Sequence, residues 1–400
     1  MKKIAILLPV LYGGGAERVA SILSQYFYEK NYKVYIFTDL PVNKKRDYDF
    51  KGMIVPLKIQ VDFPQNKILT QLMQFYQLVL KVKKVKYFKK KYNIDFSISF
   101  MEEYNLVNVL SKVKDKTFIR VCTILSARKD EFVDSIYYYP KILKHVYNKA
   151  HKVIVMTDYA KNDLVQNYGI KSKQIQIIPN PLLLKIKNEN QKVWEYGSKA
   201  IVTVARLEKV KQQQHIIRSF SEVLNKQPDA KLIFVGNGSG KYVEYLKKLI
   251  KELNIEQSVF LVGGQKNVEF YLANSRAFVL TSKTEGFPNS MLEALEVGIP
   301  IISSDCPGAP REILNPSMKS DIKIDKIIYG EYGILIPNLD GKKYSAKEQL
   351  TKEEEYLKIA MEEILSSPES ENKYRNVAKV KMKAYAVDTI GKNWEILFRG

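Results

Sequence analysis

Short apolar runs alternate along this chain with longer stretches in which apolar residues recur every three or four positions. The first such pair is the apolar run 4–10 and the periodic stretch 16–29. Short apolar runs are typical of buried strands, and longer periodic stretches are typical of helices. Further short runs occur at 34–37, 95–100, 117–121, 152–156 and 175–178. Strands and helices in alternation predict an α/β fold with a parallel sheet.

A second set of the same kind begins after a polar segment. The prolines that flank Asn180 and the polar run 185–192 are typical of a linker. Beyond them, strands are predicted at 200–204, 231–235, 259–262, 277–280, 299–304 and 333–337, and helices at 351–365 and 390–398. A chain of 400 residues is also too long for one ordinary core. We therefore expect two similar α/β domains, 1–184 and 185–384, and a closing helix in 385–400 that packs on the first domain.

The segment 277–298 combines a strand, a glycine-containing turn and a helix. Asn289 or Ser290 is expected to cap this helix. The N–H groups at such a helix start bind anions, because they have no partner within the helix. Glu285 and Glu293 bracket the turn, so the segment suits a ligand with both phosphate and hydroxyl groups. The alternative is a capped helix with two solvated glutamates.

Two cations follow the predicted strand 200–204. Arg206 can bind phosphate in a bidentate manner, and Lys211 adds a point charge five residues later. A strand end with two such cations suits a diphosphate. A solvated surface pair is the alternative, since basic residues are abundant in this chain.

Composition narrows the class of protein. The chain is 46% hydrophobic and 27% charged, which is typical of a globular protein. Cys122 and Cys306 lie far apart without metal-ligand spacing, which fits a reducing cytosol. Three scattered histidines argue against a histidine-based metal site. No apolar run approaches the roughly 20 residues of a membrane span.

The formal charge of +21 calls for an anionic partner: nucleic acid, anionic lipid or an anionic substrate. Seven lysines between Lys81 and Lys91 are interleaved with Val82, Val85, Tyr87 and Phe88. This pattern is typical of a basic amphipathic helix on an acidic bilayer. It is equally typical of a surface helix whose valines and aromatic residues face the core, and both interpretations stay open here.

A glycine loop, Gly13 to Gly15, follows the first predicted strand. In parallel α/β sheets, ligands bind at this carboxyl end of the strands. The loop is not Gly-x-Gly-x-x-Gly, and no matching acid follows the second strand. The sequence therefore argues against NAD binding.

Glu285 and Glu293, separated by seven residues within Glu-Gly-Phe-Pro-Asn-Ser and Leu-Glu-Ala-Leu, resemble the signature of the retaining glycosyltransferases of family 4. Further segments match that family at Arg206 to Lys211, 235–238, 263–267, 307–312 and 333–337. The resemblance implies a GT-B fold, in which two Rossmann-like domains face a cleft and the C-terminal domain holds a nucleotide sugar.

The resemblance also implies a role for each matching residue. Glu285 would contact hydroxyl groups of the donor sugar, Glu293 the ribose diol, and Arg206 and Lys211 the diphosphate. The other donor-binding positions are Gly286, Phe287, Pro288, Asn289 and Ser290 beside the sugar and diphosphate, Gly263, Gln265 and Asn267 beside the base, and Gly14 and Gly15 from the first domain.

Two positions depart from the family's pattern. Gln212 stands where a glycine usually follows the lysine. Many relatives also carry a histidine near the sugar in the N-terminal domain, whereas residues 125–130 contain none. They resemble the Ser-x-Arg variant of some capsule-type members, so Arg128 is a candidate for the acceptor side.

The expected activity is that of a metal-independent hexosyltransferase that retains anomeric configuration. A hexose or N-acetylhexosamine would pass from a nucleotide sugar, with UDP as the expected nucleotide, to a glycan or polyprenyl-diphosphate-linked acceptor. Such a reaction belongs to capsule or O-antigen synthesis and needs no cofactor, metal or nucleic acid. The expected location is the cytoplasm, with attachment to the inner face of the plasma membrane if the basic segment binds lipid.

Three alternatives were weighed against this expectation. A nucleotide-sugar epimerase of GT-B fold would convert its substrate without an acceptor. A basic nucleic-acid-binding protein would explain the charge, but the chain has no recognisable recognition module. Asp47-Tyr48-Asp49 is a formal Asp-x-Asp metal motif, and it follows the basic residues 44–46 instead of a buried strand. We interpret it as a solvated loop.

Overall fold

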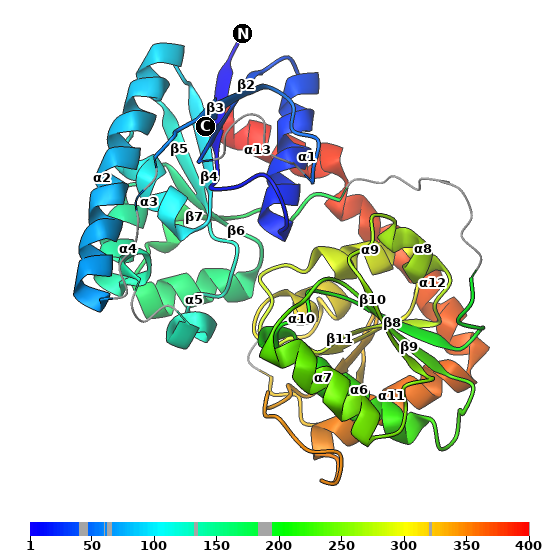
Figure 1. Cartoon of the computed structure of the whole chain (residues 1–400). Coiled ribbons are helices and arrows are strands. Elements are labelled where there is room, and N and C mark those ends of the chain that lie inside the picture. The colour runs from blue at the N-terminus through cyan, green and yellow to red at the C-terminus, as the bar shows by residue number, and fades with distance from the viewer. Residues whose placement is uncertain are drawn as a thin grey trace. The chain divides into compact units, whose positions relative to one another are not determined.

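The computed structural model describes residues 1–39, 47–59, 61, 66–131, 135–182, 194–319 and 322–399 (Figure 1). The predicted linker 185–192 and the basic residues 44–46 lie outside these ranges. The chain divides into two compact units: Met1–Leu183 with Tyr385–Gly400, and Leu184–Ala384. Within the described ranges, none of the helices is both long and apolar enough to span a bilayer.

The first unit is built on a seven-stranded sheet of order β3-β2-β1-β4-β5-β6-β7. Its strands are all parallel. They are β1 Lys3–Leu7, β2 Lys33–Thr38, β3 Met53–Pro56, β4 Phe96–Phe100, β5 Lys116–Arg120, β6 Lys152–Val155 and β7 Ile175–Ile177. The predicted strands of this half are present, and β3 is an additional edge strand that the pattern did not indicate.

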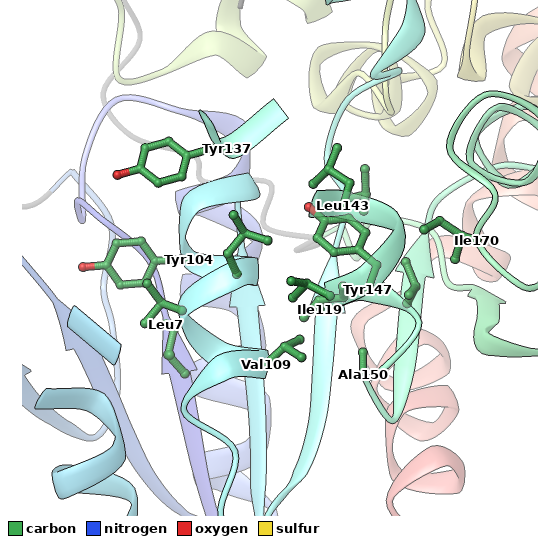
Figure 2. Packing of buried hydrophobic residues seen from close by; sticks show 14 of the residues in the cluster. Leu7, Tyr104, Val109, Ile119, Tyr137, Leu143, Tyr147, Ala150 and Ile170 are labelled. Atoms are coloured by element: carbon green, nitrogen blue, oxygen red, sulfur yellow. The ribbon is translucent and has the colours of Figure 1, made fainter. Parts of the chain in front are cut away.

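Helices cover both faces of this sheet, because alternate side chains of a strand point to opposite faces. Ile4 and Ile6 of β1 share a core with α1, Gly15–Glu29, and with α13, Val387–Arg399, whose Trp394 is fully buried. The other face, which includes Leu7, packs against α2 Lys67–Tyr92, α3 Glu102–Leu110, α4 Pro140–Tyr147 and α5 Asp158–Tyr168. Figure 2 shows that packing around Leu7, Tyr104 and Tyr147.

The second unit repeats this architecture with the order β10-β9-β8-β11-β12-β14-β13. Its strands are β8 Ala200–Val204, β9 Lys231–Val235, β10 Val259–Gly263, β11 Ala277–Leu280, β12 Ile301–Ser304, β13 Ile328–Tyr329 and β14 Ile334–Ile336. They are parallel except for the edge strand β13, which is antiparallel to β14. The two sheets therefore match the predicted α/β class.

The helices of the second unit also lie on both faces of its sheet. One face packs against α6 Gln213–Val223, α7 Lys241–Glu252 and α11 Lys352–Ser366. The remaining helices are α8 Val268–Ala273, α9 Asn289–Val297, α10 Ala309–Leu314 and α12 Pro368–Met382. Of these, α8 contacts β8, and α9 contacts β11 and β12.

The basic segment 81–91 forms the end of α2, and its apolar residues face the core except for Tyr87, which is exposed. Val85 is fully buried, and Val82 and Phe88 pack against the same cluster. The hypothesis that all seven lysines face a bilayer is wrong for Lys81 and Lys89. Lys81 Nζ is bonded to Asp39 at 2.7 Å and Glu103 at 2.6 Å, and Lys89 Nζ is bonded to Asp115 at 2.9 Å. A buried charge needs such partners, because removal from water is costly.

Candidate functional site

Two loops are joined by hydrogen bonds at the carboxyl edge of the second sheet. β8 leads into the turn η4, Lys209–Lys211, and β11 leads into the turn before α9. The Thr281 hydroxyl donates to the carbonyl of Lys211 at 3.0 Å, and the Lys283 N–H donates to the carbonyl of Val210 at 2.8 Å. Two segments that are 70 residues apart in sequence thus form one surface.

Lys211 and Glu285 meet on this surface as an ion pair. Lys211 Nζ donates to Glu285 Oε1 at 2.6 Å, and Ser282 Oγ donates to the same oxygen at 2.5 Å. The Lys211 side chain is 21% exposed and the Glu285 side chain 9%. Among the described residues, both side-chain hydrogen bonds of Glu285 fall on Oε1 and none falls on Oε2. The pair is ordered and remains accessible from solvent.

The backbone of Glu285 is also fixed on both sides. Its N–H donates to the carbonyl of Pro307 at 3.0 Å, and its carbonyl accepts from the N–H of Ala309 at 3.1 Å. These bonds join the β11–α9 turn to the loop that follows β12. The carboxylate is therefore positioned by two neighbouring strand ends of the sheet, which suits a residue that must present one oxygen to a ligand.

The helix α9 begins one residue earlier than a cap at Asn289 requires and two residues earlier than a cap at Ser290 requires. Its N-cap is Pro288, and no side chain caps the helix, so the predicted Asn289 or Ser290 cap is wrong. Proline presets the backbone at this position and offers no side-chain acceptor. Pro288 therefore supplies no side-chain acceptor to the positive end of the helix dipole, where an anion can bind. Glu293, in the second turn, is buried.

Arg206 does not join the Lys211–Glu285 pair in this structure. Its side chain is 65% exposed, and Nη1 lies 2.9 Å from Glu208 Oε1. The carbonyl of Arg206 accepts from Gln213 Nε2 at 2.8 Å, which holds the loop against the start of α6. The structure thus brings Lys211 and Glu285 together and leaves Arg206 nearby in sequence, with its guanidinium in solvent.

Glycines allow the neighbouring loops to pack closely. A Cβ on Gly236 would lie 2.0 Å from the carbonyl oxygen of Ala205, and the φ of Gly236 is 153°. Asn237 Oδ1 accepts from the Gly264 N–H at 2.7 Å and so links the loop after β9 to the loop after β10. The sequence places this loop in a family motif, and the role of Asn237 is evident only from the structure.

The predicted base-contacting residues have local structural bonds. Gly263 adopts a φ of 72°, which glycine tolerates and other residues rarely adopt. Gln265 Nε2 donates to the carbonyl of Val262 at 2.6 Å. Asn267 Oδ1 caps α8 through the N–H of Phe270 at 3.0 Å. The loop is therefore well ordered at the carboxyl edge of the sheet.

The glycine loop of the first unit lies at the corresponding edge of its own sheet. Gly14 is the N-cap of α1, and Gly15 is its first residue. A Cβ on Gly14 would lie 2.1 Å from Glu17 Oε2, so a larger residue here would require the Glu17 side chain to move. The Gly13 N–H donates to Asp47 Oδ2 at 2.9 Å. Asp47 thus stabilises the glycine loop, and it lies outside any strand as expected.

The same edge carries buried charges that sequence reasoning missed. Arg120 Nη2, at the end of β5, donates to the carbonyl of Ile178 and to Asn180 Oδ1, at 3.1 and 2.7 Å. Burial lowers the pKa of Arg120 to about 10. Burial also raises the pKa of Glu102, which accepts from the Tyr138 hydroxyl at 3.0 Å. The sequence could have indicated these two residues as site candidates, since Glu102 and Arg120 lie at the carboxyl ends of predicted strands.

Arg128 lies in the short helix η1, Ser126–Glu131. Its guanidinium donates to Glu131 Oε2 from Nε at 2.8 Å and from Nη2 at 2.5 Å. Its charge also lowers the pKa of Glu102 against the larger effect of burial. Arg128 thus belongs to the same polar region of the first unit as Glu102. Among the described residues, no group of three or more His, Cys, Asp or Glu side chains is arranged to hold a metal ion.

Comparison with known proteins identifies a family model that matches residues 185–318, described as glycosyl transferases group 1. The chain is 33% identical over 277 residues to an uncharacterized glycosyltransferase of Methanocaldococcus jannaschii, covering 66% of this chain and 68% of that protein.

Two further similarities extend over almost the whole chain. One is to the N-acetylgalactosamine-N,N'-diacetylbacillosaminyl-diphospho-undecaprenol 4-alpha-N-acetylgalactosaminyltransferase of Campylobacter jejuni, at 26% identity over 96% of each chain. The other is to the crystal structure of Anabaena Alr3699/HepE in complex with UDP, with a TM-score of 0.71 at 15% identity, covering 99% of this chain and 98% of that one. The second similarity concerns the fold.

Proposed function

Because this chain belongs to the group 1 glycosyl transferases and has the GT-B fold, we propose that the carboxyl edge of its second sheet binds a nucleotide sugar. The sugar passes from that donor to a glycan or lipid-linked glycan. The observation that carries the proposal is the accessible Lys211–Glu285 pair beside a helix start without a side-chain cap. Cation, carboxylate and helix dipole together match a ligand with a diphosphate and hydroxyl groups.

The proposed donor is a UDP-linked hexose or N-acetylhexosamine. Two similar proteins support this choice. The Anabaena protein, which has the same fold, is in complex with UDP in its crystal structure. The Campylobacter relative is named as an N-acetylgalactosaminyltransferase. The latter's name also contains a diphospho-undecaprenol acceptor. We therefore propose that the acceptor of this enzyme is a polyprenyl-diphosphate-linked glycan in capsule or related surface-glycan synthesis. Such an acceptor places the reaction at the inner face of the plasma membrane.

The proposed chemistry breaks the bond between the anomeric carbon and the diphosphate oxygen. Negative charge grows on the leaving diphosphate, and Lys211, Arg206 and the N-terminus of α9 stabilise it. These groups provide the positive charge that a divalent metal supplies in other enzymes, so the proposed reaction is independent of metal. Arg206 reaches the diphosphate by exchanging Glu208 for phosphate, which its exposure allows.

Glu285 orients the sugar in this mechanism and is not a nucleophile. Its Oε1 is occupied by Lys211 and Ser282, and Oε2 accepts a sugar hydroxyl. The acceptor oxygen attacks from the face that the diphosphate leaves, and its proton passes to a diphosphate oxygen. This sequence retains the anomeric configuration without a covalent enzyme intermediate.

The remaining donor contacts complete the proposed site. Glu293 binds the ribose diol, and the backbone of 286–290 contacts the sugar and diphosphate. The loop of Gly263, Gln265 and Asn267 lies against the base. In the first unit, Gly14 and Gly15 are the proposed donor-contacting residues, and Arg128 is the proposed residue of the acceptor side.

A panel of nucleotide sugars tests this function directly. The protein is incubated with each donor and a polyprenyl-diphosphate glycan in the presence of a chelator, and release of nucleoside diphosphate is measured. One donor is expected to give acceptor-dependent release and a product whose anomeric configuration matches the donor. Loss of activity in chelator contradicts metal independence, and conversion of the donor without acceptor identifies an epimerase instead.

A further inference from the structure

The first half of α2 exposes an unusual number of large apolar side chains. They are Ile68, Leu69, Leu72, Met73, Phe75 and Tyr76, with exposed fractions between 36 and 70%. Single exposed apolar residues are common on protein surfaces, but a contiguous group marks an interaction surface. We call these six residues the apolar half of α2.

The second half of the same helix is basic on the same face. At about 100° per residue, the apolar half occupies an arc of about 160°, and Lys83, Lys86 and Lys90 fall within that arc. All three lysines are exposed. One face of α2 therefore changes along its length from apolar to positively charged. We call this face the docking face.

The opposite side of α2 fixes the rotation of the helix. Leu78 and Val85 are buried in the core, and Lys81 and Lys89 hold carboxylates there through their ammonium groups. A helix held by the ion pairs of two buried lysines cannot turn its docking face inward without breaking those pairs. Exposure of the apolar half is thus a consequence of the core that holds α2.

Tyr139, whose ring carries a polar hydroxyl, lies next to the apolar half of α2. Gln71 Nε2 donates to the Tyr139 hydroxyl at 2.9 Å, and the Tyr139 side chain is exposed. Tyrosine at the edge of an apolar surface suits the boundary between acyl chains and headgroups. Lys141 and Lys144, on the following helix α4, are exposed as well.

We propose that the docking face of α2 binds an anionic phospholipid bilayer. The apolar half lies in the headgroup and acyl boundary, and Lys83, Lys86 and Lys90 contact lipid phosphates. This proposal rests on the proposed function only for its purpose, which is to bring the enzyme to a lipid-linked acceptor. It also changes the membrane hypothesis from the sequence, since most of the apolar contact comes from 68–76 and only Tyr87 of the segment 81–91 is an exposed aromatic residue.

Charge favours a bilayer over a second copy of this chain. In a parallel pairing of two docking faces, lysines would face lysines. In an extended antiparallel pairing, the lysines of one copy would cover the apolar half of the other. Both arrangements are unfavourable, whereas an acidic bilayer offers an apolar layer and phosphates side by side.

Co-sedimentation of the full chain with vesicles of phosphatidylglycerol and phosphatidylcholine tests the apolar half. The double variant Leu72→Glu/Phe75→Glu is expected to lose at least tenfold in vesicle affinity. The matched control Ile396→Glu/Val380→Glu introduces the same charges at equally exposed apolar positions on α13 and α12, and it is expected to bind as the wild type does. Equal affinity of all three proteins overturns the proposal.

A second pair of variants tests the lysines. Lys83→Gln/Lys86→Gln/Lys90→Gln is expected to weaken binding about 100-fold, since each lysine at an anionic surface contributes about fivefold. Lys247→Gln/Lys248→Gln/Lys251→Gln removes the same charge from α7 and is expected to leave affinity within about twofold of wild type. An equal loss in both variants shows that net charge alone drives binding, which overturns the docking face.

Two measurements separate this proposal from the proposed function. Transfer to a short water-soluble acceptor is expected to be unchanged in the docking-face variants, because they leave the donor site intact. Unchanged vesicle binding with intact transfer overturns the docking face alone, and vesicle binding without transfer to any acceptor overturns the function alone. A wild-type dimer that Leu72→Glu/Phe75→Glu converts to a monomer assigns the face to a second copy, against the proposal.

Discussion

Each unit of this enzyme contains a lysine–carboxylate pair, and the two pairs differ in their access to solvent. In the first unit, Lys89 and Asp115 lie 2.9 Å apart, and both side chains are fully buried. In the second unit, Lys211 and Glu285 lie 2.6 Å apart, with 21 and 9% of their side chains exposed. Nearly the same contact therefore occurs in two environments.

The surroundings of each pair explain what it can do. Lys89 also donates to the carbonyl and side chain of Asn108, and Asp115 also accepts from Ser97. Every charge in this group is satisfied within the protein, so the group joins α2, α3 and the sheet. Lys211 and Glu285 instead keep one side open at a sheet edge. A sealed pair stabilises the fold, and an open pair can bind a ligand.

The largest expected effect comes from breaking the sealed pair. Asp115→Ala leaves the Lys89 ammonium buried without its counter-ion, which costs about 3–5 kcal/mol of the free energy of unfolding. Denaturant unfolding of the full chain measures this loss. Asp229→Ala, which breaks the exposed pair with Lys199, is the matched control and is expected to cost less than about 1 kcal/mol. Equal losses contradict the distinction between the two environments.

The pH dependence of the same difference gives an independent check. Burial alone would raise the pKa of Asp115, but Lys89, Ser97 and the Val113 N–H outweigh it and hold that pKa below its ordinary 3.8. The contribution of Asp115 to stability is therefore full above pH 3.8 and is lost as the pH falls through the folded pKa. The wild type is expected to lose its advantage over Asp115→Asn in this acidic range. A constant difference contradicts the assignment.

The next effect is on catalysis and leaves the fold intact. Glu285→Gln keeps the shape of the side chain and removes the charge that orients the sugar and holds Lys211. The turnover number is expected to fall about 10²–10³-fold, in the range of a lost transition-state contact. The free energy of unfolding should change by less than about 1 kcal/mol, because water can reach Lys211.

Glu293→Ala is the companion variant for the second acid of the motif. It is expected to raise the KM for the donor more than it lowers turnover, since the ribose does not take part in bond breaking. Near-normal rates in both variants contradict the site. The control is Glu296→Ala, because Glu296 lies in the same helix and has no proposed contact with the ligand.

The smallest expected effect is that of Arg206→Ala. Its guanidinium is largely hydrated and already paired with Glu208, so only the difference between that state and the phosphate-bound state is lost. Donor and nucleoside diphosphate are expected to bind about tenfold more weakly, and by the same factor, as a diphosphate contact requires. Calorimetric titration measures both affinities. An unchanged affinity for nucleoside diphosphate removes Arg206 from the site.

Much of the fold could be predicted because its central strands are largely buried. In a parallel sheet covered on both faces, strands such as β8 and β9 are continuous apolar runs that contrast sharply with amphipathic helices. The edge strand β3 was missed because Met53 is exposed and the strand has only four residues. The helix cap at Asn289 or Ser290 was wrong because Pro288 presets the turn.

The site could be predicted only as a set of residue types at strand ends. Sequence placed Glu285 after one strand and Lys211 after another, but their contact depends on which strands are neighbours, and here β8 lies beside β11. The burial of Lys89 could not be predicted for a related reason. Its partner Asp115 is 26 residues away, and a helical segment with seven lysines between 81 and 91 gives no sign of which ones find a carboxylate.

The central claim is that the open pair, Lys211 and Glu285, marks the donor site. Calorimetric titration of uridine diphosphate into wild type, Lys211→Ala and the remote control Lys251→Ala tests this claim most directly. The account predicts binding to the wild type and the control with equal affinity, and about 10- to 100-fold weaker binding to Lys211→Ala, because a charge-assisted phosphate contact is lost. Equal affinity in all three proteins would contradict it.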